Sequence, residues 1–351
     1  MKAWISDAVH HTLSLSEKPV PVPARGEVLV RVLACGVCRT DLHVIDGELE
    51  SHHPGVTPGH QVVGEVTALG DAVTGLAVGD LVGAAWLRST CGVCEWCRSG
   101  RENLCPFSTY TGWDADGGYA EYLTVPEAFA YLLPAGTDPV STAPLLCAGI
   151  IGYRSLLRAA LPPGGSLGLY GFGSSAHLTA QIAKAAGARI FAITRGKANQ
   201  ELARSLGAEF VGDEHAVPPE PLDSAIIFAP VGDIVPQALR ATKRGGTVVT
   251  AGIHMTDIPA MNYESELFYE RDLRTVTANT RADGAAFLRI AHNLGLVPDV
   301  TLYPFSRVDE ALNDLRAGNA SGSLVISSGS LVISSGSLVI SSGSAPESKE
   351  K

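Results

Sequence analysis

The stretch "SLGLYGFGSSAHLTAQIAKAAGARIFAITR", residues 166–195, has the order of a strand, a glycine turn, a helix and a second strand. An apolar run precedes the glycines, apolar residues then recur at helical spacing, and "RIFAITR" follows as another apolar run. Strands that alternate with helices in this way predict a parallel sheet.

The glycine turn in this stretch, "GFGSSA", fits the spacing G-x-G-x-x-A. The hexamer alone is weak evidence because glycine turns are common, but here a strand precedes it and a helix follows it. Gly171 would allow the tight turn, Gly173 would let a pyrophosphate approach, and Ala176 would let the helix pack closely. The N-terminus of the helix then faces the phosphates. The sequence therefore predicts a dinucleotide-binding domain of the Rossmann type.

The end of the second strand indicates which dinucleotide is bound. An NAD site usually has an acidic residue there, which binds the adenosine ribose hydroxyls. This chain has Thr194 in that place, followed by Arg195 and Lys197. The two cations would attract a 2′-phosphate that an acid would repel, so NADP is favoured over NAD. Stacking of Arg195 on adenine, its exposure to solvent, and use of both cofactors remain open alternatives.

Strands and helices continue to alternate beyond this stretch. A second helix is expected at 198–208, and strands are expected at 223–229, 245–253 and 272–279. Residues 1–148 instead carry short valine-rich runs between glycine and proline turns, which indicates a β-rich domain. At 351 residues the chain is long enough for two domains.

The composition excludes several classes of partner. With 26 Lys and Arg against 36 Asp and Glu, the formal net charge is −10, and no basic run occurs. This balance argues against a nucleic-acid or anionic-membrane partner. No apolar run is long enough for a membrane span, and residues 1–11 lack the pattern of a signal peptide. We therefore expect a cytoplasmic protein.

Four of the seven cysteines fall in "CGVCEWCRSGRENLC", residues 91–105. The two-residue gaps can direct neighbouring thiolates at one ion, and the longer gap returns the fourth thiolate. This spacing predicts a structural zinc site with all four positions filled by Cys91, Cys94, Cys97 and Cys105. An iron–sulfur cluster and a reduced loop without metal are the alternatives.

The other three cysteines are Cys35, Cys38 and Cys147. With His60, the last two would make a Cys2His set, which leaves one of zinc's four positions open for substrate. Spacing alone does not establish this set, because its members lie far apart in the chain and an isolated Cys or His is more often only packed. We expect Cys35 to be a small packed residue.

In their order along the chain, several motifs resemble those of the zinc-containing medium-chain alcohol dehydrogenases, the bacterial and yeast enzymes above all. They are "GVCRTDLH", "PGHQVVGEV", "VGDLVG", the cysteine run, "DGGYAEY" and "CAGI", and the resemblance extends over residues 1–327. It implies an α/β protein with a GroES-like β-rich catalytic domain (1–148), a Rossmann domain (149–278), a return segment that completes the catalytic domain (279–327) and a C-terminal tail (328–351).

The resemblance implies that Cys38, His60 and Cys147 bind a catalytic zinc, and that the cysteine run binds a second, structural zinc. Zinc with an open position lowers the pKa of an alcohol, and hydride then passes to the nicotinamide. The expected activity is reversible oxidation of an alcohol, primary by preference, to an aldehyde or ketone, by a homodimer or homotetramer. A polyol or specialised aldehyde enzyme of the same family, and a non-enzymatic nucleotide-binding or thiol-sensing protein, are the alternatives.

The resemblance also implies roles around the zinc. The expected proton relay is Thr40 and His43, Asp41 would hold the histidine ligand, and Arg39 would meet the cofactor pyrophosphate. Trp86 would line the substrate pocket, and Trp113 is a further candidate for its wall.

Two features depart from the family pattern. The family usually has Glu after the histidine ligand, where this chain has Gln61, so an approach of a carboxylate to the zinc during ligand exchange is lost. The heptamer "SGSLVIS" occurs three times, at 321–341. We expect the first copy to be the closing strand of the sheet, and the later copies either to remain undocked or to form an added meander or pair with another subunit.

Overall fold

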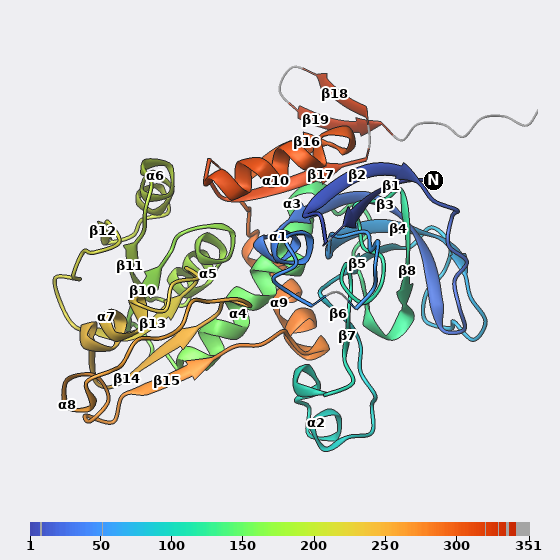
Figure 1. Ribbon diagram of the computed structural model, residues 1–351. Helices are drawn as coiled ribbons and strands as arrows, with labels where there is room; N and C mark the ends of the chain where they lie inside the picture. The colour runs from blue at the N-terminus through green and yellow to red at the C-terminus, as the bar shows by residue number, and fades with distance from the viewer. Residues whose placement is uncertain (8, 51, 320, 329, 335–336, 342–351) are drawn as a thin grey trace, which may run out of the picture.

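The computed structural model describes residues 1–351 except 8, 51, 320, 329, 335–336 and 342–351. Figure 1 shows a parallel sheet with its helices on the left and a β-rich region on the right. Among the described residues, no single helix is long and apolar enough to cross a membrane. One bent pair of segments, Pro139–Leu146 and Ala148–Ala159, meets that length and composition only jointly, with a bend of 41°.

The parallel sheet has the Rossmann strand order that the glycine turn predicted. Its order is β12-β11-β10-β13-β14-β15, and every neighbouring pair is parallel. The strands are β10 (Ser166–Tyr170), β11 (Arg189–Ile193), β12 (Phe210–Gly212), β13 (Leu222–Ile227), β14 (Thr242–Thr250) and β15 (Asp272–Thr275). The chain leaves β10 toward one edge and returns on its other side, so a crevice opens at the carboxyl end of β10. The short β12 was not predicted.

Helices cover both faces of this sheet. They are α5 (Ser174–Ala185), α6 (Lys197–Ser205), α7 (Ile234–Ala241) and the short α8 (Tyr263–Glu266). Successive strand residues alternate between two buried clusters, because side chains of a strand point to opposite faces. Leu169 packs in the cluster that contains α5, and Tyr170 packs in the cluster that contains α7.

The β-rich region is built on a seven-stranded sheet of order β16-β17-β3-β4-β5-β9, with β8 also paired to β3. Its strands are β3 (Glu27–Val37), β4 (Gln61–Leu69), β5 (Leu81–Ala84), β8 (Tyr122–Pro126), β9 (Ala130–Leu132), β16 (Val300–Pro304) and β17 (Ser323–Ser327). A separate hairpin joins β1 (Lys2–Asp7) to β2 (Thr12–Glu17). Near its C-terminal end, around the helices α9 (Arg281–Leu294) and α10 (Val308–Ala317), the chain returns to this seven-stranded sheet and adds β16 and β17 to it.

Helix α4 (Ala148–Ala159), which the sequence reading missed, lies between the two sheets in Figure 1. Two of its glycines allow neighbouring helices to pack closely: a Cβ on Gly149 would lie 2.4 Å from Phe287 of α9, and one on Gly152 would lie 2.3 Å from Thr179 of α5. Glycine has a low helix propensity, so the two glycines that allow this close packing also make the helix hard to predict from the sequence.

Short elements complete the chain. They are α1 (Arg39–Ile45), β6 (Leu87–Ser89), α2 (Glu95–Arg98), η1 (Glu102–Leu104), β7 (Thr109–Tyr110), η2 (Glu127–Phe129), α3 (Pro139–Thr142), η3 (Ala143–Leu146) and η4 (Phe305–Arg307). The lobe that contains α2 and η1 projects away from both sheets (Figure 1).

The first "SGSLVIS" copy forms β17, as predicted. It pairs in parallel with β16 and antiparallel with β3, and Leu324, Val325 and Ile326 are buried. The later copies form β18 (Ser330–Ser334) and β19 (Ser337–Ser341), which pair antiparallel with each other as a separate two-stranded sheet. The later copies thus stay outside the seven-stranded sheet, as expected for undocked copies, and pair with each other.

Candidate functional site

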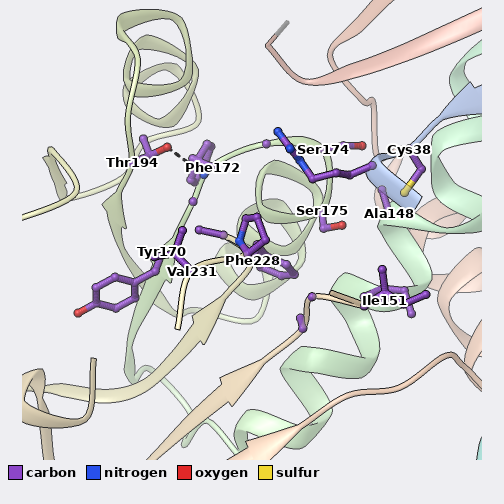
Figure 2. A pocket seen from close by; sticks show the side chains of 18 of the residues that line it. Cys38, Ala148, Ile151, Tyr170, Phe172, Ser174, Ser175, Thr194, Phe228 and Val231 are labelled. Atoms are coloured by element: carbon purple, nitrogen blue, oxygen red, sulfur yellow. Dashed lines mark hydrogen bonds between the residues drawn. The ribbon is translucent and has the colours of Figure 1, made fainter. Parts of the chain in front are cut away.

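A cavity of about 1460 Å³ extends from the glycine turn after β10 to the three separated metal-ligand candidates. Figure 2 draws Phe172, Ser174 and Ser175, of the glycine turn and the start of α5, together with Cys38 and Ala148, all of which line the cavity. The cavity lies at the carboxyl end of β10, where open α/β sheets bind their ligands. It therefore joins the predicted cofactor turn to the predicted metal site.

Three elements bring Cys38, His60 and Cys147 together. Cys38 precedes α1, His60 precedes β4, and Cys147 precedes α4. One ligand atom of each lies within 4.8 Å of the other two, and Nε2 of His60 lies 3.3 Å from Sγ of Cys147. All three line the cavity. Two sulfurs and one nitrogen facing an open space could hold a zinc ion with one position free.

Asp41 orients this set from behind. One of its carboxylate oxygens lies 3.0 Å from Nδ1 of His60 and accepts the backbone N–H of Gly59 at 3.2 Å. The other oxygen accepts the hydroxyl of Tyr119 and the backbone N–H of Cys38, each at 2.8 Å. Because Nδ1 of His60 is held in this way, Nε2 is the nitrogen left for a metal. The sequence reading named Asp41 but missed Tyr119, although "DGGYAEY" had been singled out.

The electrostatics of the set favour a cation. Burial lowers the pKa of His60, but the Asp41 carboxylate and Cys38 outweigh it and raise that pKa to about 10. His60 and Asp41 are both almost fully buried. Negative charge concentrated in a buried place is stabilised by a metal ion with the same ligands. The donor set therefore fits zinc.

The two predicted relay residues both lie on α1 and line the cavity. The Oγ1 atom of Thr40 lies 3.6 Å from Sγ of Cys38. Nδ1 of His43 contacts a carboxylate oxygen of Glu48, a residue that the sequence reading did not single out. His43 also lies beside His254, with ring centroids 5.2 Å apart.

An aromatic wall forms one side of the cavity near the metal set. The rings of Trp86, Tyr110 and Trp113 stack on one another with centroids 4.9 to 5.9 Å apart. Trp86 also meets the edge of His60 at 5.0 Å. Both predicted tryptophans line the cavity, and Tyr110 joins them although the sequence reading did not name it. Stacked rings present an apolar surface to a small substrate.

The glycine turn has the geometry that its spacing predicted. Gly171 has φ 85°, and a Cβ there would lie 3.0 Å from the backbone nitrogen of Ala229. A Cβ on Gly173 would meet nothing within 4 Å, so the backbone at this position faces open space. Ala176 is fully buried on α5. Thr194 accepts the Phe172 N–H at 3.1 Å, so its hydroxyl holds the turn (Figure 2).

The cations after β11 do not lie equally close to the cavity. Arg195 lines it and pairs with Glu214, with 3.4 Å between Nε and a carboxylate oxygen, while its side chain is 77% exposed. Lys197 begins α6 and is exposed, outside the described lining of the cavity. Arg39 is exposed and lines the cavity at the start of α1. Glu214 was missed because it follows β12, the unpredicted strand.

The four-cysteine lobe gathers its sulfurs around one point. The Sγ atoms of Cys91 and Cys105 are 3.6 Å apart, those of Cys94 and Cys97 are 3.5 Å apart, and those of Cys91 and Cys97 are 4.0 Å apart. Four thiolates at tetrahedral angles around zinc would be separated by roughly 3.8 Å, given a Zn–S bond of ~2.3 Å. An iron–sulfur cluster holds its ligand sulfurs farther apart, because they bind different irons. The lobe therefore fits a single ion.

Gln61 lies beside His60 at the start of β4 and is buried. Its Oε1 has no hydrogen-bond partner among the described residues. The side chain packs on Gly36, where an added Cβ would lie 2.9 Å from the Gln61 amide carbon. Gln61 also lines the cavity.

The sequence matches two protein-family models and a probable alcohol dehydrogenase. The family model "Alcohol dehydrogenase GroES-like domain" matches residues 24–135, and the model "Zinc-binding dehydrogenase" matches residues 176–293. A probable alcohol dehydrogenase AdhA of Mycobacterium tuberculosis is 58% identical over 312 residues, which cover 88% of this chain and 90% of that protein.

Two solved structures are similar along nearly the whole chain. A cinnamyl alcohol dehydrogenase from Sorghum bicolor aligns with a TM-score of 0.84 at 30% identity, covering 93% of this chain and 97% of that one. A cobalt- and zinc-bound thermostable alcohol dehydrogenase from Pyrobaculum aerophilum aligns with a TM-score of 0.85 at 28% identity, covering 93% of this chain and 99% of that one.

Proposed function

The chain belongs to the zinc-dependent medium-chain alcohol dehydrogenase family, and we propose that it oxidises primary alcohols with NADP in the cavity between its two sheets. The family makes it an NAD(P)-dependent alcohol dehydrogenase, so the non-enzymatic alternative falls away. The main observation behind the proposed reaction is that one cavity extends from the glycine turn to Cys38, His60 and Cys147.

These three residues are the proposed ligands of the catalytic zinc. Bound there, zinc would supply a Lewis acid that lowers the pKa of an alcohol hydroxyl. Asp41 keeps His60 in place through Nδ1, and the apolar rings of Trp86 and Trp113 exclude water from the reacting atoms. Thr40 and His43 would carry the proton away from the buried site.

The four cysteines of the lobe are the proposed ligands of a structural zinc, which gives two zinc ions per chain. With every position filled by sulfur, this ion has no place for substrate. The close distances between the sulfur atoms and the absence of disulfides among the described cysteines support this assignment.

The preference for NADP rests on Arg195 and, with less geometric support, on Lys197. Arg195 lines the cavity next to the glycine turn and could turn toward a 2′-phosphate. Its contact with Glu214 is exposed, and an exposed ion pair contributes only about 0–1 kcal/mol. Arg195 can therefore leave Glu214 at little cost. Arg39 is the proposed contact of the pyrophosphate.

We also propose that the protein is a homodimer or homotetramer, that it is cytoplasmic, and that its substrate is a primary rather than a secondary alcohol. The aromatic wall supports the last of them, because Trp86, Tyr110 and Trp113 narrow the space beside the metal set.

The test is a comparison of kcat/KM for NADPH and NADH with a panel of aldehydes. Arg195→Ala should lower kcat/KM for NADPH by about ten- to a hundredfold, as expected for one charge-assisted contact, and leave NADH nearly unchanged. Glu214→Gln is the matched variant: it frees Arg195 and should raise kcat/KM for NADPH a few fold. Equal losses with both cofactors in Arg195→Ala would refute the NADP assignment.

A further inference from the structure

His43 has little direct access to solvent. Its side chain is 9% exposed, whereas that of Glu48, which its Nδ1 contacts, is 45% exposed. We propose that Glu48 is a positioning residue for alcohol oxidation: it holds the His43 ring and passes the relay proton to water. This inference rests on the proposed role of His43 as a base in that relay.

A local turn brings the carboxylate onto the ring. Helix α1 ends at Ile45, and Gly47 then has φ 71°, a left-handed conformation that residues other than glycine rarely adopt. The backbone N–H of Leu49 donates to the carbonyl of His43 at 3.2 Å, which closes the turn. Glu48 therefore follows α1 by a few residues but folds back over its last turn.

The contact decides which ring nitrogen of His43 is free. The hydrogen bond from His43 lowers the pKa of Glu48, so the carboxylate is charged and can only accept. The proton must then be on Nδ1, and Nε2 has its lone pair available to take a proton from the alcohol side. A base in the other tautomer could not accept at that atom.

The same contact supplies a way out for the proton. When Nε2 takes up a proton, the ring becomes an imidazolium with a proton on each nitrogen. The Nδ1 proton then passes to the Glu48 carboxylate and from there to water, which leaves a neutral imidazole with its proton on Nε2. Proton exchange with water returns the ring to the Nδ1–H tautomer before the next turnover. Two other basic groups are close: the His254 ring faces His43, and Arg39 is near enough to Glu48 to lower its pKa. The Glu48 carboxylate thus lies near the guanidinium of Arg39 as well as the His43 ring.

Glu48→Gln tests this directly, because the amide can still accept a hydrogen bond but carries no charge. The loss of the carboxylate removes a negative charge beside the ring, so the acid limb of kcat/KM for the alcohol should move to lower pH. The maximal kcat/KM should fall roughly three- to tenfold, since the proton leaves more slowly. Zinc content and melting temperature should not change.

Asp7→Asn is a matched control. His10 and Asp7 form a second histidine–carboxylate pair, with 2.6 Å between Nδ1 and a carboxylate oxygen, but it is exposed and at the end of β1. Its removal should leave both the pH profile and kcat/KM unchanged. In the double variant His43→Ala, Glu48→Gln the loss should equal that of His43→Ala alone, because Glu48 acts through His43.

The outcomes separate this inference from the function on which it rests. An unchanged pH profile in His43→Ala would overturn the relay and, with it, the role of Glu48. A changed profile in His43→Ala together with an unchanged profile in Glu48→Gln would overturn only the inference. Additive losses in the double variant would also overturn it, since Glu48 would then act independently of His43.

Discussion

The two cysteine-containing sites differ in where their ligands come from. In the lobe, one short stretch supplies all four sulfurs, and the helix within it, α2, has no buried residue among those described. In the cavity, three ligands come from the ends of β3, β4 and α4, which are elements of the core. A lobe with so little packing would depend on the proposed ion to fold, whereas the cavity set takes its geometry from core strands and from α4.

This difference indicates how loss of each metal should act. At the cavity set the fold would remain and the chemistry would stop, because the ligands are placed by buried strands and by Asp41. The four lobe cysteines are outside the described lining of the cavity, so there the fold rather than the reaction would suffer, because a closed zinc site contributes folding free energy. The predictions that follow test this contrast in order of decreasing effect.

The largest effect is expected from Cys38→Ser. Alcohol oxidation should fall by about a thousandfold or more, since Lewis-acid catalysis contributes several kcal/mol. Metal analysis should show the loss of about one zinc per chain, and the melting temperature should stay close to that of the wild type.

Cys35→Ala is the control for loss of a thiol as such. Cys35 is fully buried on β3, three residues before Cys38, and lies outside both groups of ligand candidates. This variant should keep both zinc ions and its activity. A Cys38→Ser enzyme that stays active would refute the division of roles between the sites.

Cys94→Ser should act on stability rather than on the reaction. Loss of a closed zinc site should lower the free energy of unfolding by about 3–5 kcal/mol and the melting temperature by several degrees. Protein that remains folded should keep most of its activity per remaining catalytic zinc. Calorimetry and metal analysis measure the two quantities separately, and an unchanged melting temperature would show that the lobe folds without its ion.

Much of this contrast could be predicted from local sequence. The glycine turn and the cysteine run each lie in one stretch, so spacing alone indicates their geometry. Helix α4 could not be predicted in this way, since its Gly149 and Gly152 serve contacts with distant Phe287 and Thr179. Tyr119 reaches Asp41 across 78 positions of the chain, which no local pattern records.

Glu102 connects the lobe to helix α9, and its substitution should lower the stability of the protein less than Cys94→Ser does. Its carboxylate accepts hydrogen bonds from Arg281, the first residue of α9: one from the backbone N–H at 2.8 Å and one from the guanidinium at 2.6 Å. Burial raises the pKa of Glu102, but these bonds outweigh it and hold the pKa below its ordinary value. Glu102→Gln should therefore cost about 1–3 kcal/mol at neutral pH while both zinc ions remain.

The pH dependence of this effect has a definite sign. A carboxylate whose pKa is lower in the folded state stabilises the fold above its unfolded pKa of about 4.3, and this stability is lost as the pH falls through the folded value. Denaturation curves of the wild type and Glu102→Gln should accordingly differ at pH 7 and converge as the pH falls past the ordinary glutamate pKa and through the lower folded value. A difference independent of pH would mean that the charge of Glu102 does not matter.

The smallest effect concerns exchange of the ion in the cavity. Gln61 is buried beside His60 with an unpartnered Oε1, so a carboxylate in its place would have no hydrogen bond to offset its burial unless a cation were near. In Gln61→Glu that charge can approach the zinc while another ligand leaves, which should speed release of the cavity zinc to a chelator a few fold. The proposed lobe zinc, which four sulfurs would hold, is the internal control and should leave at its original rate. Equal acceleration of both ions would mean that the variant loosens the whole fold, and no acceleration of either would mean that position 61 does not govern exchange.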